Sequence, residues 1–216
     1  MQVAYSMKKI WKKWNNEFLI GSGLFILAVF LRVYNLTVIP IFGDEAIYIR
    51  WAQVMRAEPT LRFLPLSDGK QPLFMWVAIP FLKIFSDPLV AGRIVSVFSG
   101  LGTLIGVFIL TQLLFKSRKI SWFASLTYAI SPFSVFFDRL ALADSSLTMF
   151  GVWTLIFVVI TVRKVRLDSA MLTGFALGGA LLTKTPATFF AILMPLTLIL
   201  HEWPKKLRER FNRFSI

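Results

Sequence analysis

Two acidic motifs hold the residues of this chain that are best suited to chemistry, in a sequence with only 11 Asp and Glu among 216 residues. The first, IFGDEAIY, contains the adjacent pair Asp44 and Glu45, and the second, DRLALADSSL, contains Asp144. Carboxylates can take a proton from a hydroxyl group or bind a divalent metal ion through their oxygens. A structural explanation is also open for each, because acids in the first turn of a helix complement its dipole and Asp is a frequent N-cap.

Four basic residues lie close to these acids or next to apolar segments. Lys70 lies in DGKQPLFMW, Arg93 in AGRIVSVFSG, Arg139 in FFDRLALAD and Lys184 in LLTKTPA. Cations at a membrane surface can stabilise the charge of a phosphate group. Lysines at such places also snorkel towards lipid head groups without any function. The guanidinium of Arg93 lies inside an apolar run and therefore needs an acid or a phosphate as its partner.

The elements that must position these residues are membrane helices. Hydrophobic residues make up 56% of the chain and charged residues 16%, against roughly 25% charged residues in a soluble domain. The formal net charge of +13 is best explained by membrane orientation, since Lys and Arg collect in cytoplasmic loops, and we expect no nucleic-acid partner. The chain has no cysteine, which excludes disulfides and thiolate metal sites.

Long apolar segments run through the whole sequence. They are Phe18–Leu36, Pro72–Phe85, Leu89–Phe115, Ile120–Phe137, Ser145–Val162, Ser169–Thr183 and Pro186–Leu200. The second of them is shorter than the roughly 20 residues that cross a bilayer and contains Pro80 and Lys83, so it is predicted to be an interfacial or re-entrant helix. With that segment excluded, every basic cluster falls on the cytoplasmic side, which predicts six spans in the plasma membrane with both termini cytoplasmic.

This topology brings distant parts of the sequence to the outer membrane face. The loops 37–88, 138–144 and 184–186 all lie there, and residues 44–57 are expected to form an amphipathic helix along the interface. Acids, lysines and an aromatic surface then lie together where a lipid-linked phosphate would sit. Such a site suits the transfer of a sugar from a polyprenyl-phosphate lipid.

Two other functions remain open from the residues alone. A multi-pass transporter or flippase of lipid-linked substrates would need ionisable residues near the middle of its spans. A non-catalytic membrane subunit would need only helix packing, for which the small-residue spacing of Gly174 and Gly178 is typical. Neither of them explains why acids and cations gather at one face.

Five motifs, taken in order, resemble those of the GT-C membrane glycosyltransferases, in the branch that contains the protein O-mannosyltransferases and the lipid A aminoarabinose transferase. They are FGDEAIY, GKQPLFMW, AGRIVSVFSG, DRLALADSSLTMF and GGALLTKTPA, and the resemblance covers residues 18–200. It implies an all-α fold, a polytopic transmembrane helical bundle of GT-C type with about six spans and juxtamembrane helices in the first outer loop. The chain departs from the branch at Gln71 and Thr185, where a proline and a glycine are usual.

The resemblance also implies roles for particular residues. Asp44 would be the catalytic base or a metal-facing acid, with Glu45 beside it and Asp144 as the second active-site acid. Lys70 and Lys184 would bind the donor phosphate. Arg93 would assist these lysines in binding the phosphate. From the residues alone, Arg139, one turn before Asp144, could likewise hold the phosphate or pair with either aspartate.

The reaction implied by the resemblance is an inverting transfer. The donor would be a polyprenyl-phosphate-linked sugar, and the acceptor a protein, a lipid or a glycan. No cofactor is certain, and a divalent metal ion is left open.

The implied domain organisation is a membrane-embedded glycosyltransferase domain over residues 1–201 and a basic cytoplasmic tail over residues 202–216. Members of the branch usually carry further spans and often an outer domain. The chain is therefore expected to be the N-terminal part of a longer enzyme, a split subunit or an inactive relic.

Overall fold

A computed structural model describes the backbone of residues 2–200 and the side chains of residues 17–200, and this part of the chain is all helical. The predicted tail, residues 202–216, lies outside the described residues. The α-helices of the described part are α1 (Gln2–Val33), α2 (Gly43–Ala57), α3 (Leu73–Ile84), α4 (Pro88–Phe115), α5 (Arg118–Ile130), α6 (Pro132–Asp138), α7 (Ala143–Lys164), α8 (Leu167–Thr183) and α9 (Thr188–Leu193). Short 3₁₀ segments are η1 (Pro59–Leu61), η2 (Leu64–Asp68), η3 (Thr185–Ala187) and η4 (Met194–Leu200).

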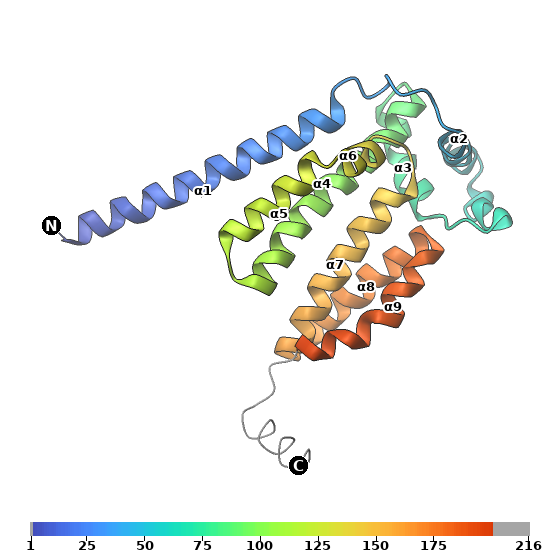
Figure 1. The fold of residues 1–216 in the computed structure, drawn as a ribbon. Coiled ribbons are helices and arrows are strands. Elements are labelled where there is room, and N and C mark those ends of the chain that lie inside the picture. The colour runs from blue at the N-terminus through green and yellow to red at the C-terminus, as the bar shows by residue number, and fades with distance from the viewer. Residues whose placement is uncertain (1, 201–216) are drawn as a thin grey trace, which may run out of the picture.

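The helices form a bundle with α4 and α7 side by side at its centre (Figure 1). Helix α5 packs on α4, and α8 packs on α7. The C-terminal half of α1 contacts α4 and α5, while its N-terminal half extends away from the other helices. Helices α2 and α3 gather with η1 and η2 at one end of the bundle, which we call the α2 end.

Within the described residues, two helices are long and apolar enough to cross a membrane, α4 and α7. The pair α5 and α6 becomes a third if the two helices form one span, although they are bent by 60°. Helices α3 and α8 and the segment Thr185–Leu200 are shorter. The all-α fold with membrane-length helices is confirmed, as is the short length of the Pro72–Phe85 segment, whereas six spans are not shown.

The bend between α5 and α6 divides the segment that the sequence predicted as one uninterrupted run, Ile120–Phe137. Pro132 opens α6, and Ser131 before it has φ −58° and ψ 120°, because a residue before proline avoids the helical region. Helix α6 therefore turns away from the axis of α5. This turn carries the end of α6, at Asp138, onto α4.

Glycines on α4 permit this close packing. A Cβ atom on any of three of them would overlap a side chain of α6 or α7, namely Asp138 at Gly100, Met149 at Gly102 and Val152 at Gly106. By contrast, Gly174 and Gly178 on α8 have no heavy atom within 4 Å of a Cβ position among the described residues. A side chain at either position would therefore meet no neighbouring helix, so close packing does not require these two glycines.

Helix α2 begins where the sequence predicts, with Asp44 and Glu45 in its first turn. Its buried face is Glu45, Tyr48, Ile49, Ala52 and Met55, packed against α3 and α4. Ile47, on another side of this predicted amphipathic helix, is exposed, whereas Trp51 is half-buried and packs against the same core. The apolar side expected at the interface is therefore only partly exposed.

Candidate active site

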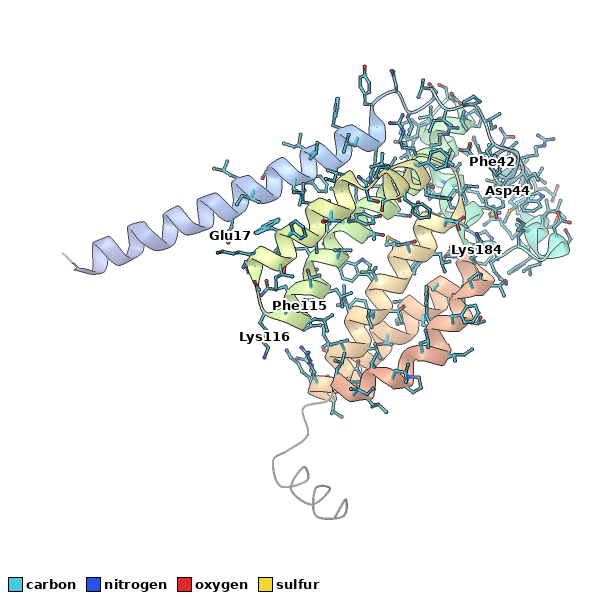
Figure 2. The ribbon with its side chains drawn as sticks, in the orientation of Figure 1. Glu17, Phe42, Asp44, Phe115, Lys116 and Lys184 are labelled. Atoms are coloured by element: carbon cyan, nitrogen blue, oxygen red, sulfur yellow. The ribbon has the colours of Figure 1, made fainter. Side chains whose placement is uncertain are left out.

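Side chains from separate parts of the chain meet at the α2 end of the bundle. Figure 2 shows Asp44 and Lys184 towards this end, and Lys116 at the opposite end. Helix α3 connects the two regions, because it packs on α2 and also contacts α8, which ends one residue before Lys184. The segment predicted as the first outer loop therefore contacts, through α3, the helix that ends at the Lys184 turn.

The first accessible pair joins Asp44 and Lys70. The Lys70 ammonium lies 3.8 Å from Asp44 Oδ1, with both side chains about half exposed, at 40% and 46%. The same ammonium lies 5.5 Å from the centre of the Tyr48 ring, a cation–π arrangement. Gly69, at φ +67°, turns the chain out of η2 so that Lys70 points back to α2, a backbone conformation that glycine adopts without strain.

The second accessible pair joins Asp144 and Lys184 at a distance of 2.7 Å. Both side chains are 37% exposed. Lys184 has an extended backbone conformation immediately after α8. Its backbone N–H donates a hydrogen bond to the Ala180 carbonyl in the last turn of that helix. The N-cap of α7 is Leu142, so Asp144 lies within the first turn and its carboxylate pairs with a lysine instead of capping the helix.

Glu45, the other half of the first acidic motif, is fully buried against Arg93. Arg93 donates to both carboxylate oxygens, at 2.9 and 2.8 Å. Glu45 also accepts the N–H groups of Ala141 at 2.6 Å and Phe42 at 3.0 Å, and Arg93 donates to the Leu36 carbonyl at 2.7 Å. This one ion pair therefore ties α2, α4, the α6–α7 loop and the segment after α1 together.

The environment of Glu45 keeps it ionised. Burial of the carboxylate raises its pKa, but the hydrogen bonds from Arg93, Ala141 and Phe42 outweigh burial, so the pKa of Glu45 lies below its ordinary value of 4.5. With no exposed surface, this carboxylate is out of reach of a substrate in this arrangement. Its contacts are those of a positioning residue, and Arg93 is equally enclosed.

An apolar groove lies between α7 and the segment of α9 and η4. It encloses about 430 Å³. Its wall is formed mainly by Leu147, Gly151, Leu155, Phe190, Leu193 and Met194. Thr148, one helical turn after Asp144, also lines it, so the groove starts close to the second carboxylate–lysine pair.

The chain matches the family described as dolichyl-phosphate-mannose-protein mannosyltransferase over residues 69–214. It belongs to this family. The match confirms the resemblance drawn from the motifs, and its range includes Lys70, Asp144 and Lys184, whereas Asp44 and Glu45 precede it. No curated protein and no solved structure matches the chain.

Arg139, a predicted phosphate ligand of this mannosyltransferase-family chain, binds backbone instead. Its guanidinium donates to the carbonyls of Leu31 at 3.0 Å and Asn35 at 2.6 Å, at the C-terminal end of α1. Cations are favourable at that end of a helix. Burial lowers the pKa of Arg139, and repulsion from Arg93 lowers it further.

A second buried ion pair was not predicted from the sequence. Arg32 on α1 donates from Nε to Asp138 Oδ2 at 2.9 Å, and the Tyr128 hydroxyl donates to the same oxygen at 3.0 Å. Both charged side chains are almost completely buried. The sequence held a signal for this pair, since Arg32 and Asp138 each end an apolar segment that the predicted topology places at the same outer level.

The described residues contain no group of three or more His, Cys, Asp or Glu that could hold a metal ion. Asp44 and Asp144 each have a lysine as their charged neighbour.

Substituting Glu45 by Gln is expected to destabilise the fold strongly. The change leaves the buried Arg93 guanidinium without a counterion, a loss of about 3–5 kcal/mol in the free energy of unfolding. Glu58→Gln is the matched control, because Glu58 is exposed at the end of the same helix and should change stability by less than about 0.5 kcal/mol. Thermal unfolding in detergent at pH 7 measures both.

The same variants give an expected pH dependence. Because the pKa of Glu45 is depressed in the folded state, its stabilising effect is complete above its ordinary value of 4.5 and is lost as the pH falls below that value. The stability gap between the parent chain and Glu45→Gln should therefore narrow below pH 4.5. An unchanged gap at low pH, or equal stability at pH 7, contradicts the assigned role of the ion pair.

Proposed function

We propose that this chain is an integral-membrane glycosyltransferase that moves a sugar from a polyprenyl-phosphate-sugar donor to an acceptor hydroxyl. Membership of the family implies a lipid-linked mannosyl donor. Two accessible carboxylate–lysine contacts carry the proposal, one of which, Asp144–Lys184, lies close to an apolar groove. A lipid donor has a matching chemistry, with an apolar chain, an anionic phosphate and a sugar at its end.

In the proposed donor complex, the isoprenoid chain lies in the groove between α7 and α9. Its phosphate reaches Lys184, which stands close to the end of the groove where Thr148 lies. Lys70 is the second cation at the α2 end and approaches from the first outer loop. Charge-assisted contacts from two lysines would hold the phosphate at the membrane surface.

The proposed reaction is a direct displacement at the anomeric carbon. The acceptor oxygen attacks that carbon while the bond to the phosphate oxygen breaks, so the configuration inverts. Asp44 takes the acceptor proton as general base. The lipid phosphate leaves with the bonding electron pair, and the lysines stabilise its developing charge.

The two other acids take supporting roles in this proposal. Asp144 holds Lys184 through the 2.7 Å contact and so sets where the phosphate binds. Glu45 keeps the start of α2 in place through Arg93, so that Asp44 faces outwards. The acceptor is a protein, a lipid or a glycan that carries a free hydroxyl.

We further propose six membrane spans with the active site on the outer face of the plasma membrane. The additional spans are α1, α8 and the segment Thr185–Leu200, beside α4, α7 and the bent pair α5–α6. Lys116 lies at the opposite end of the bundle from Asp44 and Lys184 (Figure 2), and basic turns favour the cytoplasmic side. Both termini are then cytoplasmic.

Replacing Asp44 by Asn should abolish most of the transfer. With the full chain in lipid nanodiscs, polyprenyl-phosphate mannose and a mixture of peptide, glycan and lipid acceptors, the release of polyprenyl phosphate should fall about 100-fold or more. Asp68→Asn is the matched control, since Asp68 is an exposed acid of the same outer loop, and it should retain the parental rate.

Three results would contradict the catalytic proposal. Equal rates for Asp44→Asn and Asp68→Asn would remove Asp44 from the reaction. A parent chain that releases no phosphate with any acceptor class would contradict the transfer itself. Movement of the intact donor across the bilayer without cleavage would favour a flippase.

The topology is tested by labelling single cysteines, which the parent chain lacks. Asp68→Cys in η2 and Ser117→Cys in the turn between α4 and α5 are each treated on intact cells with a membrane-impermeant thiol reagent. We expect labelling of the first variant, and labelling of the second only after the membrane is permeabilised. Labelling of both from the same side would contradict the six-span arrangement.

A further inference from the structure

A small polar cavity lies beside the second carboxylate–lysine pair, enclosed by α5, α6 and α7. It has a volume of about 180 Å³. It is lined by Tyr128, Phe133, Ser134, Phe137, Asp138, Asp144, Ser145, Leu147 and Thr148. The cavity thus combines two carboxylates, several hydroxyl groups and three aromatic rings.

Polar atoms in this cavity lack partners. Ser145 is 3% exposed, and its Oγ has no hydrogen-bond partner in the described part of the chain. Asp138 uses Oδ2 for both Arg32 and Tyr128, and no hydrogen bond reaches its Oδ1 among the described residues. Buried polar groups are normally paired, so these atoms are available to a ligand that both donates and accepts hydrogen bonds.

The neighbours of the cavity indicate which part of a ligand it would receive. Asp144 lines the cavity and also holds Lys184, the proposed phosphate ligand. Leu147 and Thr148 line both the cavity and the apolar groove. The apolar groove and the polar cavity therefore adjoin each other, and the Lys184 ammonium lies at the Asp144 side of the cavity. Sites suited to the tail, the phosphate and the head of a lipid-linked sugar are thus neighbours.

We propose that this cavity binds the sugar ring of the donor and that Asp138 and Ser145 recognise its hydroxyl groups. The inference rests on the proposed function and adds the place where the sugar is selected. A volume of 180 Å³ holds the liquid equivalent of roughly six waters, a size suited to one monosaccharide. The aromatic rings provide the apolar walls against which the C–H face of a sugar packs.

Three neighbouring residues fix the position of the Asp138 carboxylate at the cavity. Arg32 and Tyr128 bind one carboxylate oxygen, and Gly100 on α4 leaves the space in which the carboxylate lies, since a Cβ there would overlap it. The Arg32 guanidinium forms an ion pair with this carboxylate, and a hydrogen bond from a sugar hydroxyl to such a carboxylate would be charge-assisted. A simple counterion role would not require the open cavity next to it.

The test compares two variants that each remove one buried, unpaired hydroxyl. Ser145→Ala removes a hydroxyl group that lines the cavity. Ser125→Ala is the matched control, because it removes a hydroxyl group on α5 that does not line the cavity. Binding to the full chain in nanodiscs is measured for polyprenyl-phosphate mannose and for polyprenyl phosphate without a sugar. Ser145→Ala should weaken only the mannose-bearing lipid, by about 3- to 10-fold, and Ser125→Ala should leave the ratio of the two affinities unchanged.

Donors with a single hydroxyl removed identify the contact directly. One deoxymannose donor should bind the parent chain more weakly than the mannose donor does, and this difference should disappear in Ser145→Ala. Equal binding of both lipids to the parent, or the same loss for both lipids in Ser145→Ala, would overturn the sugar site while leaving the glycosyltransferase proposal standing. A parent chain that binds neither lipid would overturn both.

Discussion

The buried ion pair between Glu45 and Arg93 is the interaction on which the arrangement of the α2 end depends. Four parts of the chain meet at these two side chains: α2, α4, the α6–α7 loop at Ala141 and the segment after α1 at Leu36. Consecutive residues on a helix point about 100° apart, so fixing Glu45 inwards directs its neighbour Asp44 outwards. The ion pair thus determines which carboxylate of the acidic motif can meet a substrate.

Close helix packing determines the rest of the site. Helix α6 turns at Pro132 and comes close enough to α4 that only glycine fits at position 100, which brings the Asp138 carboxylate beneath the start of α7. Asp144 lies six residues further along the chain, in the first turn of α7, and its carboxylate pairs with Lys184 directly after α8. The apolar groove and the polar cavity adjoin each other because α7 lines both, and Asp144 of the same helix pairs with Lys184.

Much of the fold could be predicted, because α4 and α7 are long apolar runs and the Gly43 start of α2 follows from local signals. The break at Pro132 was missed, since the apolar run Ile120–Phe137 continues through it. The separate roles of Asp44 and Glu45 were also missed, because they depend on Arg93, 48 residues away. The sequence did contain an indication that Glu45 is buried. Its spacing from Tyr48, Ala52 and Met55 places it on the same face of the helix as these residues, which form the buried face of α2. Arg139 could not be predicted, because its partners are carbonyl groups at the end of α1.

The most direct test of this account is the distance between η2 and the Lys184 turn. Spin labels are placed by Ser67→Cys and Thr185→Cys, two exposed positions in a chain without native cysteine, and pulsed electron spin resonance in nanodiscs gives the distance distribution. The account predicts one narrow distribution in this labelled chain and in its Glu58→Gln variant, and a broad one in its Glu45→Gln variant. An equally narrow distribution in the Glu45→Gln variant would contradict the claim that the ion pair holds the active site together.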